Sequence, residues 1–170
     1  TVIKGGDKVW EQVDEDNFFR VDISEDCDNF PMVWKLPSMR AFQSVVTTSI
    51  MDFYEYIGIH RDVASRPDVS HYTIRGLLSV KYYYKEIIDD VTYDRLKSGD
   101  YSIPDDYDEK KNTDYTIIPD ELEGFRYVGE NGRFEIYEND LYIPMGFAYD
   151  TYIPREDADK LSKTSREKIM

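Results

Sequence analysis

The feature that most constrains the fold is a hairpin signal near the carboxyl end of the chain. Asn131 and Gly132 stand between two runs, 125–129 and 133–138, in which apolar and polar residues alternate. Asn-Gly favours a two-residue turn because both of its positions tolerate the positive φ that such a turn requires. Alternation with a period of two places apolar side chains on one face of a strand. We therefore expect an antiparallel pair of strands, and with it a sheet.

Three further segments have the composition of strands. Residues 17–24 alternate apolar and polar side chains, which predicts a half-buried strand. Residues 77–84 form a near-continuous apolar and aromatic run, which is typical of a central strand. Residues 142–149 contain Pro144 and Gly146, so we expect an edge strand or a bulged strand there.

Helical periodicity is clearest in one segment, at about 38–58. Apolar side chains recur there at spacings of three and four, with Ser38 as a candidate amino cap and Gly58 as a candidate stop. A single helical turn is expected at 71–76, and a C-terminal helix from Arg155 onward. The sequence therefore predicts an α+β domain with a mostly antiparallel sheet, one main amphipathic helix and a C-terminal helix.

Charge and hydropathy narrow the class of protein. The chain carries 35 Asp and Glu against 21 Lys and Arg, a net charge of -14, which opposes binding to nucleic acid and adhesion to anionic lipid heads. No apolar run approaches the roughly 20 residues that a bilayer-spanning helix needs. We expect residues 1–170 to form a single soluble domain excised from a larger protein, with 89–120 as a long surface insertion. Cys27 is the sole cysteine, so no intramolecular disulfide can form, and the sequence indicates no oligomeric state.

Motifs for catalysis are not evident in the sequence. The glycines fit neither a dinucleotide-binding nor a phosphate-binding loop, and the two histidines lack metal-site spacing, so the sequence predicts no cofactor and no catalytic residue. Asp22, Asp26 and Asp28 are candidate metal ligands, because clustered carboxylates in a turn supply the oxygens that calcium prefers. The alternative for this acidic cluster is an ordinary solvated surface.

Three segments, in this order, resemble a known family. Residues 18–22, Phe-Phe-Arg-Val-Asp, resemble an "FYRV"-type opening strand. The 38–58 segment precedes Leu-Leu-Ser-Val-Lys-Tyr-Tyr at 77–83, which resembles an "LLgVKYi" strand. Phe-Glu-Ile-Tyr-Glu-Asn at 134–139, followed by 143–149, is similar to a "yeNpyaLPlgf.y" element, although Ile143 replaces the Leu that often precedes the proline. Together they resemble the extracytoplasmic part of the YfhO family of bacterial multi-pass membrane proteins.

This resemblance implies a parent protein organised like the lipid-linked-sugar glycosyltransferases, with roles in glycosylating cell-envelope polymers such as lipoteichoic acid. The chain would then be an accessory extracytoplasmic domain of a cell-membrane protein, and it would recognise the acceptor or shape the site. Whether the chain is itself an enzyme stays open, because the catalytic carboxylate of that architecture usually lies in an early loop near the membrane. The expected partners are the parent's transmembrane helices and a glycan or polyol-phosphate acceptor.

Four side chains are candidates for substrate contact under this interpretation: Arg40, Ser44, Tyr54 and Tyr82. A guanidinium matches the geometry of phosphate, so Arg40 could bind a teichoic-type acceptor, but an ordinary salt bridge to one of the many carboxylates is the alternative. A different class of function is a non-catalytic acidic protein-interaction domain. A third is a stand-alone soluble enzyme, which would need two carboxylates facing each other in a cleft.

Overall fold

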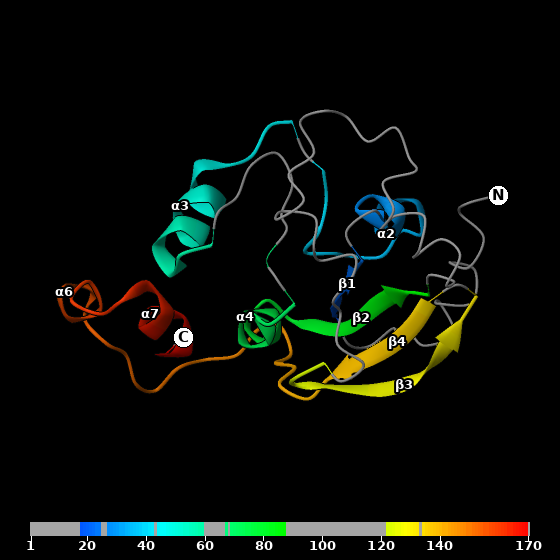
Figure 1. The fold of residues 1–170 in the computed structure, drawn as a ribbon. Helices are drawn as coiled ribbons and strands as arrows, with labels where there is room; N and C mark the ends of the chain where they lie inside the picture. The colour runs from blue at the N-terminus through cyan, green and yellow to red at the C-terminus, as the bar shows by residue number, and fades with distance from the viewer. Residues whose placement is uncertain are drawn as a thin grey trace, which may run out of the picture.

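A four-stranded mixed sheet organises the protein. The computed structural model describes residues 18–24, 27–42, 44–59, 67, 69–87, 122–132 and 134–169. Its strands are β1 (Arg20–Ile23), β2 (Val80–Glu86), β3 (Phe125–Asn131) and β4 (Phe134–Asn139), in the spatial order β1-β2-β4-β3 (Figure 1). β1 runs parallel to β2, whereas β4 is antiparallel to both β2 and β3. The α+β class with a mostly antiparallel sheet is confirmed.

The predicted β3–β4 hairpin is confirmed, but its turn lies one position later than the Asn-Gly pair predicts, because Asn131 is the last residue of β3. Asn131 pairs with Phe134, and Gly132 has a φ of 61°, in the left-handed region that glycine enters without steric cost. The register shifts between Tyr127 and Gly129, which marks a bulge in the outer strand.

The free edge of β1 is covered by the chain that follows it. The Val21 amide donates to the Pro37 carbonyl over 2.9 Å, and the Met39 amide donates to the Val21 carbonyl over 3.3 Å. Ser38 thereby forms a parallel bridge with Val21. This pairing satisfies backbone groups that an open edge would expose.

The main helix, α3 (Thr48–Ile57), begins later than the predicted start at Ser38. Ser38 is used in the bridge to β1, and Thr47 has an extended backbone with φ −67° and ψ 138°. The β-branched residues before Thr48 lose side-chain freedom in a helix, so they do not extend it towards the amino end. The predicted stop is confirmed, because Gly58 ends the helix with a φ of 91°.

The remaining helices are short: α2 (Phe30–Val33), α4 (Tyr72–Leu77), α6 (Arg155–Ala158) and α7 (Lys163–Ile169). α4 confirms the predicted helical turn, and it delays the start of β2 to Val80. The C-terminal helix is present as two pieces, α6 and α7. The strand predicted at 142–149 is wrong: that stretch is irregular, since Pro144 lacks an amide donor and Gly146 has a φ of 94°. The predicted insertion at 89–120 lies outside the described residues.

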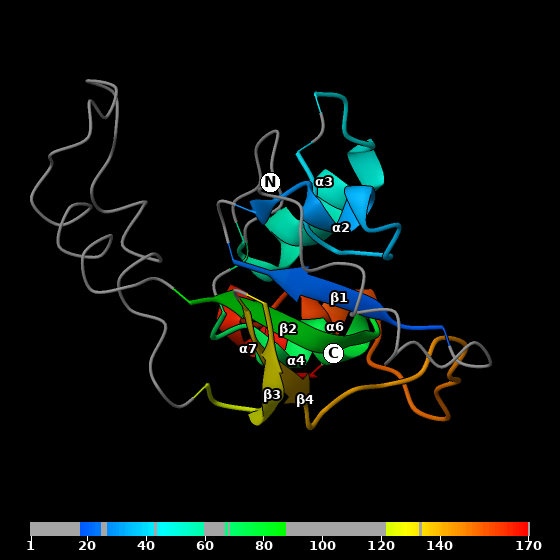
Figure 2. The same cartoon turned by 90° about the vertical axis from the view of Figure 1, so that its right-hand side faces the viewer.

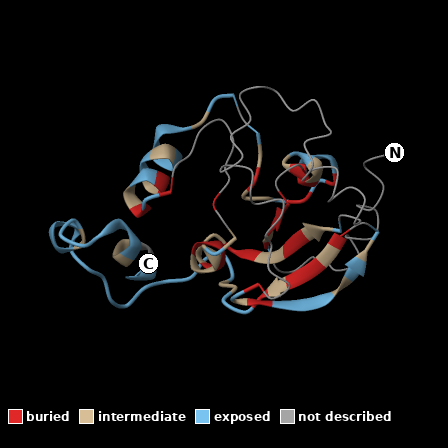
Figure 3. Cartoon of the chain, in the orientation of Figure 1, coloured by how far each residue is buried: buried red, intermediate tan, exposed pale blue. Residues whose placement is uncertain are grey.

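Apolar side chains pack on both faces of the sheet. One cluster, on the α2 side, contains Phe19, Val21, Ile23, Cys27, Trp34, Leu36, Tyr84, Phe134 and Ile136. The opposite face carries Tyr83, Leu122, Phe125 and Tyr137, with Tyr72 of α4 packed against them. A third cluster joins α3 to α4 through Tyr54, Ile57, Ile59 and Ile74. Figure 1 shows α4 at the start of β2, Figure 2 shows α2 on the β1 side of the sheet, and Figure 3 shows that burial concentrates in β1, β2 and β4.

Candidate functional site

A groove between α3 and the C-terminal helices is the candidate site. Its volume is about 490 Å³. α3 contacts α7, and α7 also contacts α4, so the groove lies at the helical end of the molecule (Figure 1). Its lining residues come from α3, from the chain before α6 and from both C-terminal helices: Ser49, Asp52, Phe53, Tyr56, Ile153, Arg155, Ala158, Arg166 and Ile169.

The α3 wall follows directly from helical geometry. Its four lining residues are spaced three, one and three positions apart, which places them on one stripe of a helix. Tyr54 and Ile57 are buried on the other side, in the cluster shared with α4. The core therefore fixes the helix, and the stripe faces the C-terminal segment.

Arg166 forms the opposite wall and is fixed by backbone carbonyls. Its Nε donates to the Ala158 carbonyl over 3.1 Å, its Nη1 to Tyr56 over 3.3 Å and its Nη2 to Asp159 over 2.9 Å. The guanidinium carbon lies 4.4 Å from the centre of the Tyr56 ring, a cation–π geometry. This arginine joins the end of α3 to the α6–α7 turn and carries its charge into the groove.

Arg155 supplies a second, more accessible charge. Its side chain is 86% exposed, with Nε 3.8 Å from an Asp159 carboxylate oxygen and the guanidinium 5.9 Å from the Tyr56 ring centre. The lining side chains thus include two arginines and one carboxylate, that of Asp52, and the Asp159 carboxylate pairs with one of these arginines, in a chain whose net charge is -14.

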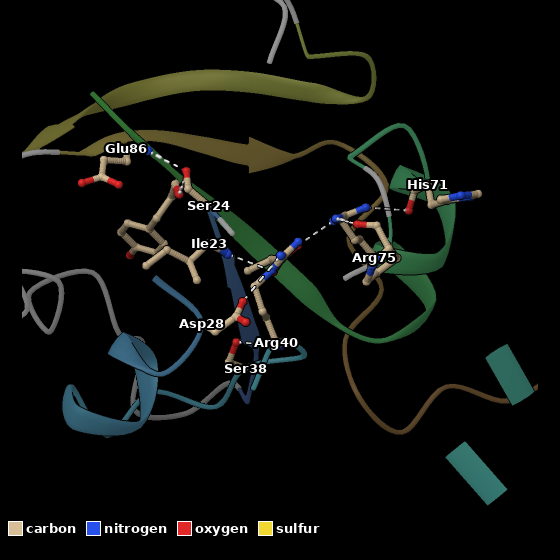
Figure 4. Close-up of polar contacts among 11 residues, drawn as sticks. Ile23, Ser24, Asp28, Ser38, Arg40, His71, Arg75 and Glu86 are labelled. Atoms are coloured by element: carbon tan, nitrogen blue, oxygen red, sulfur yellow. Dashed lines mark hydrogen bonds and ion pairs between the residues drawn. The ribbon is translucent and has the colours of Figure 1, made fainter. Parts of the chain in front are cut away.

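A second polar cluster is buried beside the sheet. Both oxygens of Asp22 accept hydrogen bonds from guanidinium groups, Oδ1 from Arg40 over 3.1 Å and Oδ2 from Arg75 over 2.9 Å. Oδ1 also accepts the Ile23 amide over 2.9 Å. Arg40 lies 3.6 Å from Asp28, a contact drawn in Figure 4. We call Asp22, Arg40 and Arg75 the buried charge cluster.

The pKa values of Asp22, Arg40 and the neighbouring Tyr83 are shifted by burial and by the neighbouring charges. Burial by itself raises the pKa of Asp22, but the charges of Arg40 and Arg75 outweigh it and hold that pKa below the ordinary value. Burial lowers the pKa of Arg40, and the charge of Asp22 more than reverses the effect. Burial, together with the charge of Asp22, raises the pKa of Tyr83 to about 12. Asp22 and Arg40 therefore stay ionised, and Tyr83 stays neutral, over the physiological range.

Arg75 also holds backbone outside the sheet. Its Nη2 donates to the Pro67 carbonyl over 2.8 Å, and its Nη1 donates to the His71 carbonyl over 3.3 Å (Figure 4). The carbonyls of the segment entering α4 are thereby satisfied by a side chain that is itself fully buried. This arrangement is typical of a structural cluster that positions helix α4.

The four predicted substrate-contact residues lie in different parts of the fold. Arg40 belongs to the buried charge cluster, in the salt bridge that the sequence offered as the alternative. Tyr54 is buried between α3 and α4. Tyr82 is half-buried and packs edge to face on Phe19 at 5.4 Å, whereas Ser44 is exposed in the chain before α3. The structure therefore does not gather them into one surface.

The candidate metal ligands are separated by their partners. Asp22 directs both oxygens at guanidinium groups, which leaves it unsuited to a cation. Asp28 faces Arg40, and Asp26 lies outside the described residues. Within the ranges that the structure describes, no group of three or more His, Cys, Asp or Glu is placed to hold a metal ion.

Sequence reasoning missed the groove residues Asp52, Tyr56, Arg155 and Arg166. The spacing of Ser49, Asp52 and Tyr56 on a predicted helix was a readable signal for one wall. The Arg166–Tyr56 contact joins positions 110 residues apart, so no local sequence pattern could have predicted it.

Comparison with known proteins places the chain in a family of membrane proteins. Residues 4–170 match the family model described as bacterial membrane protein YfhO. The chain belongs to the YfhO family. No curated protein and no solved structure matches it. In the part of the chain that the structure describes, every helix is too short or too polar to cross a bilayer.

Proposed function

We propose that this chain is an accessory, extracytoplasmic domain of a membrane protein that works like the lipid-linked-sugar glycosyltransferases of cell-envelope glycosylation. Its α3–α7 groove recognises the acceptor, a polyol phosphate of the teichoic-acid type. The observation that carries the proposal is that two arginines and an aromatic wall line one groove of an acidic protein.

The groove offers complementary chemistry for such an acceptor. Arg155 presents a largely exposed guanidinium, a planar donor group that binds phosphate in a bidentate manner. Ser49 and Asp52 supply a hydroxyl and a carboxylate that can pair with polyol hydroxyl groups. Phe53 provides an apolar face for the carbon chain, beside the Tyr56 ring on which the Arg166 guanidinium packs. Phosphate and polyol would thus be recognised by different walls.

The composition of the groove favours binding over bond formation. Glycoside hydrolysis with paired carboxylates needs two such groups flanking the bond. Among the lining residues, Asp52 is the sole carboxylate. Acceptor recognition therefore fits this groove better than glycoside hydrolysis.

A titration with glycerol-phosphate oligomers tests the proposal. Addition of the oligomers should shift backbone amide signals of α3 and α7 in the NMR spectrum of the 170-residue chain. Arg155→Gln should weaken binding roughly 10- to 150-fold, because it removes a charge-assisted hydrogen bond of roughly 1.5–3 kcal/mol. Arg126→Gln is the matched control, since Arg126 is an exposed arginine on β3 that pairs with Glu138. Unshifted α3 and α7 signals, or equal losses in both variants, would reject acceptor binding at this groove.

The side of the membrane is tested separately, with an introduced thiol. Val45 is 88% exposed, and Cys27 is buried. The membrane protein that carries this domain with Val45→Cys should react with a membrane-impermeant maleimide on intact cells, beyond the level of the unsubstituted protein. Labelling that requires cell lysis would place the domain in the cytoplasm and overturn the extracytoplasmic assignment.

A further inference from the structure

The connection between β4 and α6 exposes an unusual set of apolar side chains. We call residues 141–153 the aromatic loop. Six of its large apolar side chains are exposed: Leu141, Met145, Phe147, Tyr149, Tyr152 and Ile153. The most exposed of these side chains are Tyr149, at 66%, and Tyr152, at 84%. Figure 3 shows this connection as a largely exposed strip that leads from the sheet to α6.

The aromatic loop is attached firmly at its base. The Leu141 amide donates to Oδ1 of Asn139 over 2.9 Å, and the Ile143 amide donates to the Gly76 carbonyl over 3.3 Å. Farther along, Phe147 packs edge to face on Tyr149, with ring centres 5.2 Å apart. The loop therefore leaves the sheet and α4 from a fixed point and presents its side chains outward.

The side chains of the loop have the composition of a membrane–water interface. Tyrosine has an apolar ring and a hydroxyl tip, so it is enriched where one end is apolar and the other is wet. Asp150 is the sole charged residue in 141–153. Exposed apolar surface of this kind marks an interaction site more often than solvated surface.

We propose that the aromatic loop inserts into the headgroup region of the bilayer that holds the membrane protein. The occupant follows from family membership, because a domain of a bacterial membrane protein works beside a bilayer. It also follows from charge: a chain of net charge -14 is repelled by anionic headgroups, so contact must rest on uncharged side chains, which this loop supplies. The inference is independent of acceptor binding in the groove.

A fluorophore on an introduced cysteine tests insertion directly. Cys27 is buried and is the sole native thiol, so a cysteine placed on the surface can be labelled selectively. The 170-residue chain with Tyr152→Cys, carrying an environment-sensitive dye, should show a blue shift of emission when phosphatidylcholine vesicles are added. The matched control is Val45→Cys, an equally exposed position before α3, which should show no shift. No shift at position 152, or equal shifts at both positions, would overturn the proposal.

Vesicle flotation provides the second test. The triple variant Phe147→Ser, Tyr149→Ser and Tyr152→Ser should bind phosphatidylcholine vesicles at least tenfold more weakly than the unmodified chain. A control variant with Met32→Ser, Val33→Ser and Val45→Ser removes exposed apolar side chains elsewhere and should bind normally. Equal binding by the unmodified chain and the triple variant would overturn the proposal.

Varying the lipid charge and the protein concentration distinguishes insertion of the aromatic loop from binding through basic side chains and from contact with a second copy of the chain. Phosphatidylglycerol should weaken binding, and added salt should restore it, because screening reduces the repulsion. Stronger binding to phosphatidylglycerol vesicles would show that basic side chains carry the contact and would overturn insertion of the loop. A blue shift at position 152 that grows with protein concentration, without vesicles, would assign the loop to a second copy of the chain instead.

Discussion

Asp22 and Arg75 lie 53 residues apart in the chain and meet inside the protein, where Nε of Arg75 donates to Oδ2 of Asp22 over 2.9 Å. Both side chains are fully buried. Arg40 binds the other oxygen of the same carboxylate, so two guanidinium charges depend on one carboxylate. Removing that carboxylate's charge leaves two buried cations without their main partner, which is far costlier than losing an exposed ion pair.

Asp22→Asn should therefore lower the free energy of unfolding by about 3–5 kcal/mol, the cost of breaking a buried ion pair. Urea denaturation monitored by circular dichroism measures the change. Glu138→Gln is the matched control, because it removes the same charge from the solvent-accessible pair with Arg126. The control should lose less than about 1 kcal/mol. Similar losses in the two variants would show that the buried charge cluster stabilises the protein no more than an exposed ion pair does.

Low pH should remove the contribution of Asp22 to the free energy of unfolding. The folded pKa of Asp22 is depressed, so its contribution is present above the unfolded pKa, near 3.8, and is lost as pH falls through the lower folded pKa. The difference in unfolding free energy between the unmodified chain and Asp22→Asn should thus be constant from pH 7 to 5 and shrink below about pH 4. Urea midpoints at pH 7, 5, 4 and 3 give this difference. A gap that does not narrow in acid would contradict a depressed pKa.

High pH should lower the stability of the protein through Tyr83, whose folded pKa is raised rather than depressed. Its folded pKa is raised to about 12 from an unfolded value of 10.0, so its contribution is present below pH 10 and is lost as pH rises towards 12. The stability of the unmodified chain relative to Tyr83→Phe should therefore fall between pH 10 and 12. Urea unfolding at pH 8, 10 and 11 measures it. Tyr149→Phe is the control, because its ring is exposed to water in the folded chain as well. A constant difference for Tyr83→Phe would count against a raised pKa.

Gly76→Ala should separate α4 from the base of the aromatic loop. A Cβ at Gly76 would collide with the Leu141 carbonyl oxygen, a backbone atom that cannot swing aside like a flexible side chain. The expected loss is about 1–3 kcal/mol, typical of overpacking. Thermal unfolding measures it, and Thr73→Ala, on the same helix, is the control for a small change in α4. A stabilised Gly76→Ala variant, as helix propensity alone would give, would show that the close approach is absent.

The parts of the fold that the sequence predicted are those with local signals. The β3–β4 hairpin, the alternating strand at 17–24 and the helix stop at Gly58 each depend on residues within a few positions, although the turn of the hairpin lies one residue after the predicted Asn131-Gly132 pair. The start of α3 depended instead on a distant residue. Ser38, the expected amino end of the helix, pairs with Val21 at the edge of the sheet and is therefore not helical.

The roles of charged residues were harder to predict, for the same reason. Asp22 occupies the polar position of an alternating strand, which on sequence grounds faces water or a cation. α4 and Arg40 cover that face, and the burial of Asp22 follows from contacts across 18 and 53 residues. The groove shows the same limit, since one wall follows helical spacing on α3 and the other comes from Arg155 and Arg166, far along the chain.

The buried charge cluster also decides how the protein opens. It links β1, the stretch around Arg40 and helix α4 through the Asp22 carboxylate. Local unfolding of any one of these segments would therefore leave a buried charge without its partner. Their amide protons should accordingly exchange with solvent together, and only when the whole domain unfolds. α6 and the aromatic loop, largely exposed, can open without touching that carboxylate. The protein is thereby divided into a cooperative unit around the sheet and a separately adjustable periphery that carries the groove wall and the loop.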